Sequence, residues 1–413
     1  MIYFVSNNGN DLEDGKTPET AWKTIQKVNA SVESGDEIRF RCGDIFYGTV
    51  IAKCGISFEQ RTLYTSYGEG NRPLISNYSV ATANAWEVFA ENIYKIDMNN
   101  TQNYTGNIFN ANANAGFIKV SGRIFYNRCA KIDLLKSQWD FCCDCKNGFI
   151  YVYSEKNPAE LSDDIRIACS SSGVGIDANV ALVGLEICGT GGHGIGGITQ
   201  GAYIADCYVH EIGGSELLNY SVPNVRFGNC IELWAGSADV TVEHCKFADV
   251  YDVAITMQGN NPNRDWANMY FVNNEFWDCT QCLEIWSDGD DKSIGFVNCK
   301  FENNVCINTG DSWGYQARPN KLSSVPLLIY QLHTDKCDIS VRNNIFAGLK
   351  VALIFKLGGA SAMPKGYVIE NNTIIRSPEK PLLLKLDDEN EEAYNKFSKF
   401  IEDKNLIINR IQY

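Results

Sequence analysis

Two glutamates repeat in almost the same local sequence. Glu232 lies in the segment NCIELW, and Glu284 lies in the segment QCLEIW. In both segments apolar residues alternate with other types, as they do in a β-strand that buries one face. The alternation directs both glutamates outward, where one carboxyl can act as a general acid and the other as a general base. The segments therefore predict a site for acid–base chemistry, with ordinary solvated glutamates as the alternative.

A tryptophan accompanies each of the two glutamates. Trp234 and Trp286 follow them by two residues, so they share the outward face. Indoles on an open sheet are costly unless something covers them, and their flat rings suit a sugar. An intervening strand, VAITMQG, directs Thr256 and Gln258 to the same face. We expect these four side chains to bind substrate.

Asp252 and His193 are two further catalytic candidates. Counting back by twos from Thr256 places Asp252 at the edge of the same outward column, where a third carboxylate acts as a base or tunes a partner's pKa. His193 lies in GTGGHGIGG, whose glycines leave its ring little cover. The alternatives are a turn residue for Asp252 and a histidine bonded to backbone for His193.

Loops between the predicted strands carry arginines, asparagines, aspartates and aromatic residues, a lining typical of sugar sites. We expect these loops to leave the coils between the same strands and therefore to rise on one side. Four more residues are predicted to bind substrate: Arg226, His210, Asp288 and Arg318.

The sequence shows no established metal-binding pattern. The histidines lack the close spacing of a zinc site, and the CCxC run at 142–145 has no second half. The segment DGDDKS (288–293) offers oxygen ligands for Ca²⁺ but lacks the spaced oxygens of an EF-hand loop. We therefore expect no metal and no cofactor, with Ca²⁺ as the alternative.

Internal repeats indicate the fold that must position these residues. Six segments share an Asn or Cys, an alternating strand and a turn, with anchors at Cys207, Cys245, Asn274, Cys299, Asn344 and Asn372. A unit that recurs in this way predicts a solenoid in which each coil stacks on the one before it. Asn tolerates the backbone of a tight bend, and its amide can hydrogen-bond the next coil.

The spacing of the 16 cysteines argues against a disulfide framework. Cys207, Cys245 and Cys299 recur at one repeat position, and Cys230 and Cys282 recur at another. Cysteines at equivalent repeat positions stack as small buried apolar residues. We expect mostly free thiols and a reducing compartment.

The predicted solenoid has distinct ends and one interruption within a single domain of residues 1–413. A helix is expected from about Thr20 to Val32 as an N-terminal cap, with coil strands beginning at Glu37. Residues 78–165 read as an inserted antiparallel β subdomain, with hairpin turns at SGR and KNG. The main coils resume near Ile165 and occupy 166–388, and residues 389–413 form a C-terminal cap with a helix from Glu389 to Lys404.

Composition limits the partners of the chain. A formal net charge of −14 with no block of basic residues argues against nucleic acid. No stretch reads as a signal peptide, and no run of about 18 apolar residues predicts a membrane span. We expect a cytoplasmic protein, with a secreted protein whose signal was removed as the alternative, and the oligomeric state stays open.

The chain resembles the right-handed parallel β-helix superfamily of pectate lyases, polygalacturonases, mannuronan epimerases and several groups of glycoside hydrolases. The likeness covers the opening YFVSNNGND and TAWKTIQ, the insertion WDF and IYVYSEKNP, and the coils from GLEICGTGGHGIGG onward. It is closest to β-helix glycoside hydrolases that carry a β insertion. The resemblance implies an all-β solenoid that acts on carbohydrate, but this fold hosts several reactions.

Two departures narrow the reaction. The GHG at 192–194 precedes the acidic coils, unlike its order in polygalacturonases, and the outward columns lack the Lys or Arg base of pectate lyases. Glu232 and Glu284 are expected two coils apart, which places their Cα atoms about 10 Å from each other. Side chains that lean toward a common ligand then bring the carboxyls to the separation of about 6.5–9.5 Å found in inverting enzymes, so we expect a glycoside hydrolase that inverts. The alternatives are a lyase or C5-epimerase on a uronic-acid polymer, and a non-catalytic carbohydrate-binding β-helix.

Overall fold

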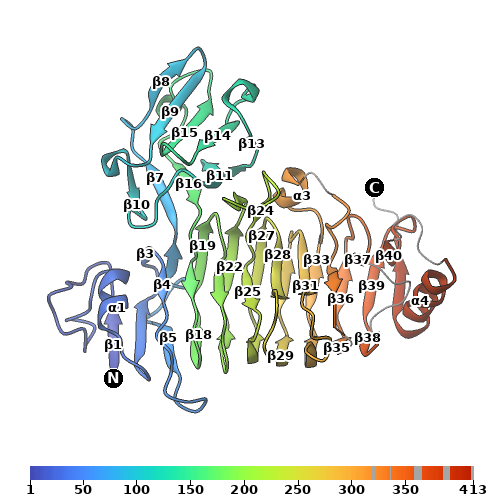
Figure 1. Ribbon diagram of the computed structural model, residues 1–413. Coiled ribbons are helices and arrows are strands. Elements are labelled where there is room, and N and C mark those ends of the chain that lie inside the picture. Colours follow the sequence, from blue (N-terminus) through green and yellow to red (C-terminus); the bar gives the residue numbers. More distant parts are fainter. Residues whose placement is uncertain (319–320, 335, 358–364, 385–390, 411–413) are drawn as a thin grey trace.

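The protein is a parallel β-helix in which three long parallel sheets run along the stack of coils (Figure 1). The computed structural model describes residues 1–318, 321–334, 336–357, 365–384 and 391–410. The sheet that carries both glutamates is called the site sheet. Its strands, in order, are β4 (Val50–Ile51), β17 (Val174–Gly175), β20 (Ile195–Gly197), β25 (Ile231–Trp234), β28 (Val253–Gln258), β31 (Gln281–Ser287), β34 (Leu327–Leu332), β37 (Ile354–Leu357) and β40 (Leu383–Leu384).

Two further parallel sheets complete each coil. The second sheet contains β1 (Ile2–Val5), β2 (Glu37–Arg41), β5 (Thr62–Tyr67), β18 (Val180–Val183), β21 (Tyr203–Ala205), β26 (Ala238–Glu243), β29 (Trp266–Val272), β32 (Phe296–Glu302), β35 (Cys337–Arg342) and β38 (Tyr367–Glu370). The third sheet contains β3 (Ile45–Tyr47), β6 (Leu74–Ser76), β19 (Glu186–Thr190), β22 (Tyr208–Ile212), β27 (Lys246–Val250), β30 (Glu275–Trp277), β33 (Val305–Ile307), β36 (Ile345–Ala347), β39 (Thr373–Arg376) and β41 (Leu406–Asn409).

The alternation in the site sheet fills the interior of the solenoid. Six predicted inward residues are at most 1% exposed: Ile231, Leu233, Ile255, Met257, Leu283 and Ile285. They belong to one continuous apolar core that runs the length of the coils. Because neighbouring strands are in register, each inward residue stacks on its equivalent in the next coil. The predicted division of these strands into inner and outer faces is confirmed.

A ladder of asparagines joins successive coils at one bend. The Nδ2 of Asn274 donates to Oδ1 of Asn304 at 3.2 Å, and the Nδ2 of Asn304 donates to Oδ1 of Asn344 at 3.1 Å. Asn372 and Asn405 continue the ladder. The residue before each of the first four asparagines takes the left-handed backbone that Asn tolerates, as at Asn303 with φ 58°. In each pair of consecutive asparagines, the first therefore forms the bend of the backbone and the second hydrogen-bonds the neighbouring coil.

The predicted anchor Cys299 was wrong. Asn304 occupies the anchor position of that coil, 30 residues after Asn274 and 40 before Asn344. Cys299 instead lies within β32, opposite Ile339. The segment NCKFENN contains both a Cys and an Asn pair. Alignment of the internal repeats selected the Cys, whereas the second Asn of the pair is the anchor. All 16 cysteines are free thiols.

Asn304→Ala should lower the free energy of unfolding by about 1–3 kcal/mol, because its buried amide partners on both neighbouring coils lose their hydrogen bonds. Chemical denaturation measures this loss. Asn303→Gly is the matched control, since glycine adopts the same left-handed backbone and the Asn303 side chain is exposed. Equal losses in the two variants would contradict a stabilising ladder.

Helices cap the two ends of the stack. At the N-terminal end, α1 (Ile25–Ser31) begins later than predicted, because Trp22 pairs with Val5 and the hydroxyl of Thr24 caps the helix. At the other end, α4 (Glu391–Lys404) agrees with the predicted helix, while residues 389 and 390 lie outside the described residues. The strand β41 after it extends the third sheet, which the predicted helical cap did not include.

The insertion is antiparallel and projects from the coils beside α3 (Trp313–Ala317) (Figure 1). One sheet contains β10 (Tyr104–Gly106), β7 (Tyr78–Ala81), β16 (Ile165–Cys169), β11 (Ala115–Val120) and β12 (Arg123–Phe125). The other contains β13 (Arg128–Cys129), β14 (Phe141–Asp144), β15 (Phe149–Tyr153), β9 (Ile93–Asp97) and β8 (Glu87–Ala90), of which β13 alone pairs parallel. Short helices lie at Thr101–Asn103, Ile132–Leu134 and, as α2, Pro158–Leu161. Parallel pairing resumes at β17, later than the expected Ile165, since β16 pairs antiparallel.

No helix among the described residues is long and apolar enough to cross a lipid bilayer.

Candidate active site

Glu232, Thr256 and Glu284 form one outward column across three neighbouring strands. Their strands pair in register, so Thr256 lies directly between the two glutamates. Strands in a sheet are about 4.8 Å apart, which puts the two glutamate Cα atoms roughly 10 Å apart. The sequence suggested a column that is open to solvent, but the structure covers it. Thr256 is fully buried, and Glu284 is only 8% exposed.

Two hydrogen-bond donors hold Glu232 as a carboxylate. The Nε2 of His193 lies 2.9 Å from one carboxylate oxygen, and the Nε2 of Gln258 donates to the other at 2.7 Å. Burial by itself disfavours the charged form. The hydrogen bonds from His193 and Gln258, together with the electrostatic attraction of the His193 ring N–H, outweigh burial and lower the pKa of Glu232. Glu232 is therefore ionised at neutral pH.

His193 is fixed in one tautomer. Its Nδ1 accepts the backbone N–H of Asn229 at 3.2 Å, which leaves the proton on Nε2, facing Glu232. The glycines around it do not leave it bare, because the ring of Phe227 lies 5.2 Å away and the side chain is 17% exposed. His193 reaches the site through Glu232, so it orients that carboxylate.

Glu284 lies in the opposite environment. Burial raises its pKa to about 8, and the negative charge of Asp252 adds to the effect. The guanidinium of Arg318 and the hydroxyl of Thr256, 3.4 Å from Oε2, act against it. Glu284 is therefore protonated at neutral pH. The column thus pairs a neutral carboxylic acid with an ionised carboxylate, the arrangement that acid–base catalysis requires.

Asp252 and Arg318 form an ion pair at the edge of this column. The Nη2 of Arg318 donates to Oδ1 of Asp252 at 2.6 Å. The Nη1 of Arg318 is buried and has no hydrogen-bond partner among the described residues. The pair is close enough to Glu284 for both charges to act on its proton. Arg318 comes from the loop after α3, and the sequence had no means of pairing it with Asp252.

Three aromatic rings line the next outward column. The Trp234 and Trp286 ring centroids are 6.1 Å apart, and the Trp286 and Tyr330 centroids are 6.3 Å apart. Gln258 lies between the tryptophans in the register, but its amide turns toward Glu232 and leaves the rings in contact. The Nε1 of Trp286 is buried without a partner among the described residues. Tyr330 was missed, although LLIYQL shows the same alternation.

Trp286→Ala should weaken substrate binding or raise KM about tenfold to a hundredfold, because a sugar loses apolar contact with the ring. The measurement is affinity and KM on a cleaved glycan, with the melting temperature recorded in parallel. The matched control is Trp277→Ala, since Trp277 lies on the third sheet and is 42% exposed. Unfolding of Trp286→Ala with unchanged affinity would show that the ring only packs under the loops.

Arg226 is placed between the insertion and the coils. Its guanidinium donates to the backbone carbonyls of Gly214, Gly116 and Tyr126, and it lies over the ring of Tyr251. Burial lowers its pKa to about 10. With its donors used on backbone, Arg226 braces the insertion against the coils and is not free to bind substrate.

His210 and Asp288 lie away from the column. His210 belongs to β22 in the third sheet, stacks on Tyr208 and approaches Glu186 at 3.0 Å. The sequence placed it near a long loop but could not show which sheet it faced. Asp288 follows β31 and pairs with His333 at 2.9 Å. His333 is part of the lining of a second cavity of about 400 Å³.

Connecting segments lie at both ends of the strands of the site sheet. Residues 213–230 and, among the described residues, 308–318 and 321–326 precede its strands, whereas 259–265 and 288–295 follow the ends of its strands. The expectation that all insertions rise on one side is therefore wrong, because spacing gives the length of a coil but not the bend at which a loop leaves it. No group of three or more metal-ligating side chains is present among the residues described.

Comparisons with known proteins show the fold. No family model matches the sequence, and no curated protein matches it. Among solved structures, XylC in complex with xylose is similar with a TM-score of 0.55 at 13% identity, over 94% of this chain and 70% of that one. An alginate lyase from Paenibacillus gives 0.46 at 12% identity, over 89% and 90%. A lacto-N-biosidase from Eubacterium ramulus gives 0.40 at 13% identity, over 99% and 68%.

Proposed function

We propose that this protein is a glycoside hydrolase that cleaves an oligo- or polysaccharide with Glu284 as general acid and Glu232 as general base. The observation that carries the proposal is the contrast between two glutamates of one outward column: His193 and Gln258 bind Glu232 and lower its pKa, whereas burial raises the pKa of Glu284. Pairs of titratable groups whose environments push their pKa values apart mark the acid and the base. The structural neighbour XylC, which is similar with a TM-score of 0.55, was solved in complex with xylose, and this is consistent with a carbohydrate ligand.

The proposed reaction is one displacement at the anomeric carbon. Glu284 gives its proton to the glycosidic oxygen as the bond to the anomeric carbon breaks. Glu232 takes a proton from a water molecule, whose oxygen forms the new bond from the opposite face. Both protons are accounted for, because Glu284 ends ionised and Glu232 ends protonated before they exchange with solvent. The two-coil separation leaves room for that water, so inversion is proposed.

His193 and Gln258 keep Glu232 ionised and oriented in this scheme. Burial keeps the proton on Glu284, the negative charge of Asp252 adds to this effect, and Arg318 limits it. Trp234, Trp286 and Tyr330 supply apolar ring faces beside the carboxyls. The unpartnered Nε1 of Trp286 is a donor for a sugar hydroxyl.

One observation favours a second candidate, a lyase acting on a uronic-acid polymer. The Nη1 of Arg318 is buried without a partner among the described residues, and a guanidinium N–H in that state can neutralise a substrate carboxylate. In β-elimination no water is added, and the new non-reducing end carries a double bond. We favour hydrolysis because Arg318 already pairs with Asp252 and the acid–base pair needs no cation.

A glycan panel that contains neutral and uronic-acid polysaccharides tests the proposal. New reducing ends and ultraviolet absorbance are read from the same reactions. Hydrolysis predicts new reducing ends without absorbance, and elimination gives both. Binding without any turnover on a broad panel would contradict an enzyme and favour a carbohydrate-binding β-helix.

A further inference from the structure

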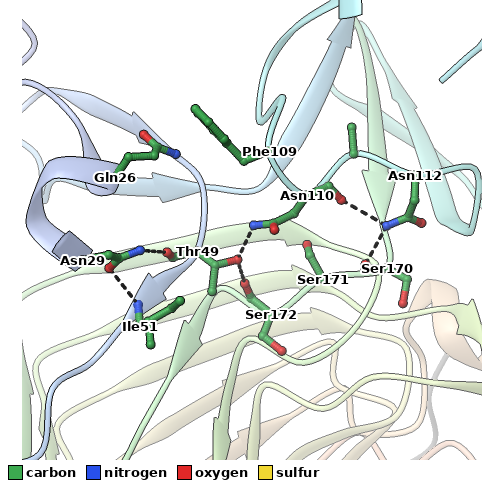
Figure 2. Close-up of a pocket in the computed structure, with 11 residues that line it drawn as sticks. Gln26, Asn29, Thr49, Ile51, Phe109, Asn110, Asn112, Ser170, Ser171 and Ser172 are labelled. Carbon is green, nitrogen blue, oxygen red and sulfur yellow. Dashed lines mark hydrogen bonds between the residues drawn. The ribbon is translucent and has the colours of Figure 1, made fainter. Parts of the chain in front are cut away.

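A cavity of about 650 Å³ opens at the N-terminal end of the site sheet, away from both glutamates. Figure 2 shows it between α1, β4 and a loop of the insertion. Its lining contains amides, hydroxyls and apolar side chains but no charged side chain. A ligand that fits this chemistry is uncharged and rich in hydroxyl groups, and a uronate or a phosphate would find no cation here.

Hydrogen bonds hold the lining in place. The Nδ2 of Asn110 donates to Oγ1 of Thr49 at 2.8 Å, and that hydroxyl donates to the carbonyl of Ser172 at 2.5 Å (Figure 2). The Nδ2 of Asn112 bridges to the carbonyl of Ser170 at 2.8 Å. Residues of the insertion, the coil segment 170–172 and the residue that precedes β4 are thus joined before any ligand arrives. A preorganised lining lowers the entropic cost of binding.

Two apolar side chains stand at the cavity with unusual exposure. Phe109 is 65% exposed, and Ile51 is 67% exposed. The amide of Gln26 has no hydrogen-bond partner among the described residues. A pyranose offers a C–H face for the ring of Phe109 and hydroxyls for the free amide. The cavity therefore matches a neutral sugar unit.

A floor without side chains connects this cavity to Glu232. Ile51, Gly175, Gly196 and Glu232 are consecutive partners in the outward column of the site sheet. A Cβ on Gly175 would meet nothing within 4 Å, and a Cβ on Gly196 would make only ordinary contacts, the nearest at 3.6 Å. Neither glycine has a positive φ. The fold thus does not require glycine at either position, although glycine weakens a strand.

The opposite direction along the same column is closed. Leu328 and Phe355 are the partners that follow Glu284, and they are 4% and 2% exposed within a packed apolar cluster. A polymer lying across the strands can therefore extend along the bare floor toward β4 and cannot extend equally toward β40.

We propose that the cavity is a distal subsite for an uncharged sugar of the same glycan chain that is cut at Glu232 and Glu284. The inference rests on the proposed function for the identity of that chain. Three strand spacings separate β4 from β25, which is on the order of 14 Å. The subsite thus selects substrates that extend several sugars from the cut bond toward the N-terminal end, and their length raises kcat/KM.

Gly175→Val and Phe109→Ala test this subsite. Binding of neutral oligosaccharides, from disaccharides to longer oligomers, is measured on a glycan array, and kcat/KM is measured for the oligomers that are cleaved. Each variant should reduce the gain from added length about tenfold and leave the shortest substrate unchanged. Gly175→Val should also raise the melting temperature, because valine favours a strand. Phe89→Ala, at an exposed ring elsewhere on the insertion, is the control.

The two arms separate failure of the subsite from failure of the proposed function. Length-dependent binding that both variants abolish supports the subsite even if no glycan is cleaved, and then only the hydrolase assignment fails. Cleavage with the same length dependence in wild type and both variants overturns the subsite and leaves the hydrolase intact. Absence of binding to every neutral oligomer also overturns the subsite.

Discussion

Glu284→Gln and Glu232→Gln should each lower turnover by at least about 10²-fold, as expected when a general acid or base is lost. Neither side chain points into the core of the solenoid, so both variants should fold. Glutamine keeps the shape of Glu284 but cannot release a proton. In Glu232→Gln the donors His193 and Gln258 face an amide that cannot take a proton from water.

Steady-state kinetics on the glycan found by the panel measure these losses, with circular dichroism as a check on folding. Glu275→Gln is the matched control, because Glu275 lies on the third sheet with its side chain 42% exposed. Wild-type activity in Glu232→Gln or Glu284→Gln would remove that residue from the mechanism.

The pH–rate profile should be a bell whose alkaline limb falls near pH 8, tenfold for each unit above it, because Glu284 must be protonated and its pKa is about 8. The acid limb should lie below the usual range of glutamate, since the pKa of Glu232 is lowered. Asp252→Asn removes a charge that raises the pKa of Glu284, so it should move the alkaline limb to lower pH. An alkaline limb unchanged in this variant would contradict the assignment of Glu284 as the acid.

Stability should report the same proton independently of activity. The pKa of Glu284 is raised in the folded state, so its contribution to stability is fully present below about pH 4.5 and is lost as pH rises to about 8. Glutamine mimics the protonated acid at every pH. Glu284→Gln should therefore match wild type at low pH and melt on the order of a few degrees higher above pH 8. Equal melting temperatures of wild type and Glu284→Gln both at low pH and above pH 8 would contradict a raised pKa of Glu284.

The repeated coils and the outward position of the two glutamates could be predicted from the pattern of residues along the sequence. Alternation in NCIELW and QCLEIW was enough to place Glu232 and Glu284 outward, and the near-identity of the two segments put them in one column. These features depend only on the two-residue period of a strand and the repetition of coils. The anchor Cys299 failed because the alignment could not distinguish the Cys from the Asn in one segment.

The chemistry of the site depends on contacts that no local pattern encodes. The sequence does not show at which bend each loop leaves its coil. For this reason it could not predict the burial of Glu284, the charges beside it, or the contacts of Arg226 with the insertion. The link between His193 and Glu232 follows from the register of Gly196 against Glu232, which can be read only once the coils are aligned. The distal cavity joins α1, the insertion and β4, which lie far apart in the sequence.

A proton NMR time course on the cleaved glycan tests the central claim most directly. The spectrum reports the anomeric configuration of the first product and shows a vinylic proton if the reaction is an elimination. Two glutamates about two coils apart predict that the first product has the inverted configuration and no vinylic signal. A retained configuration or a vinylic proton would contradict single-displacement hydrolysis by Glu284 and Glu232.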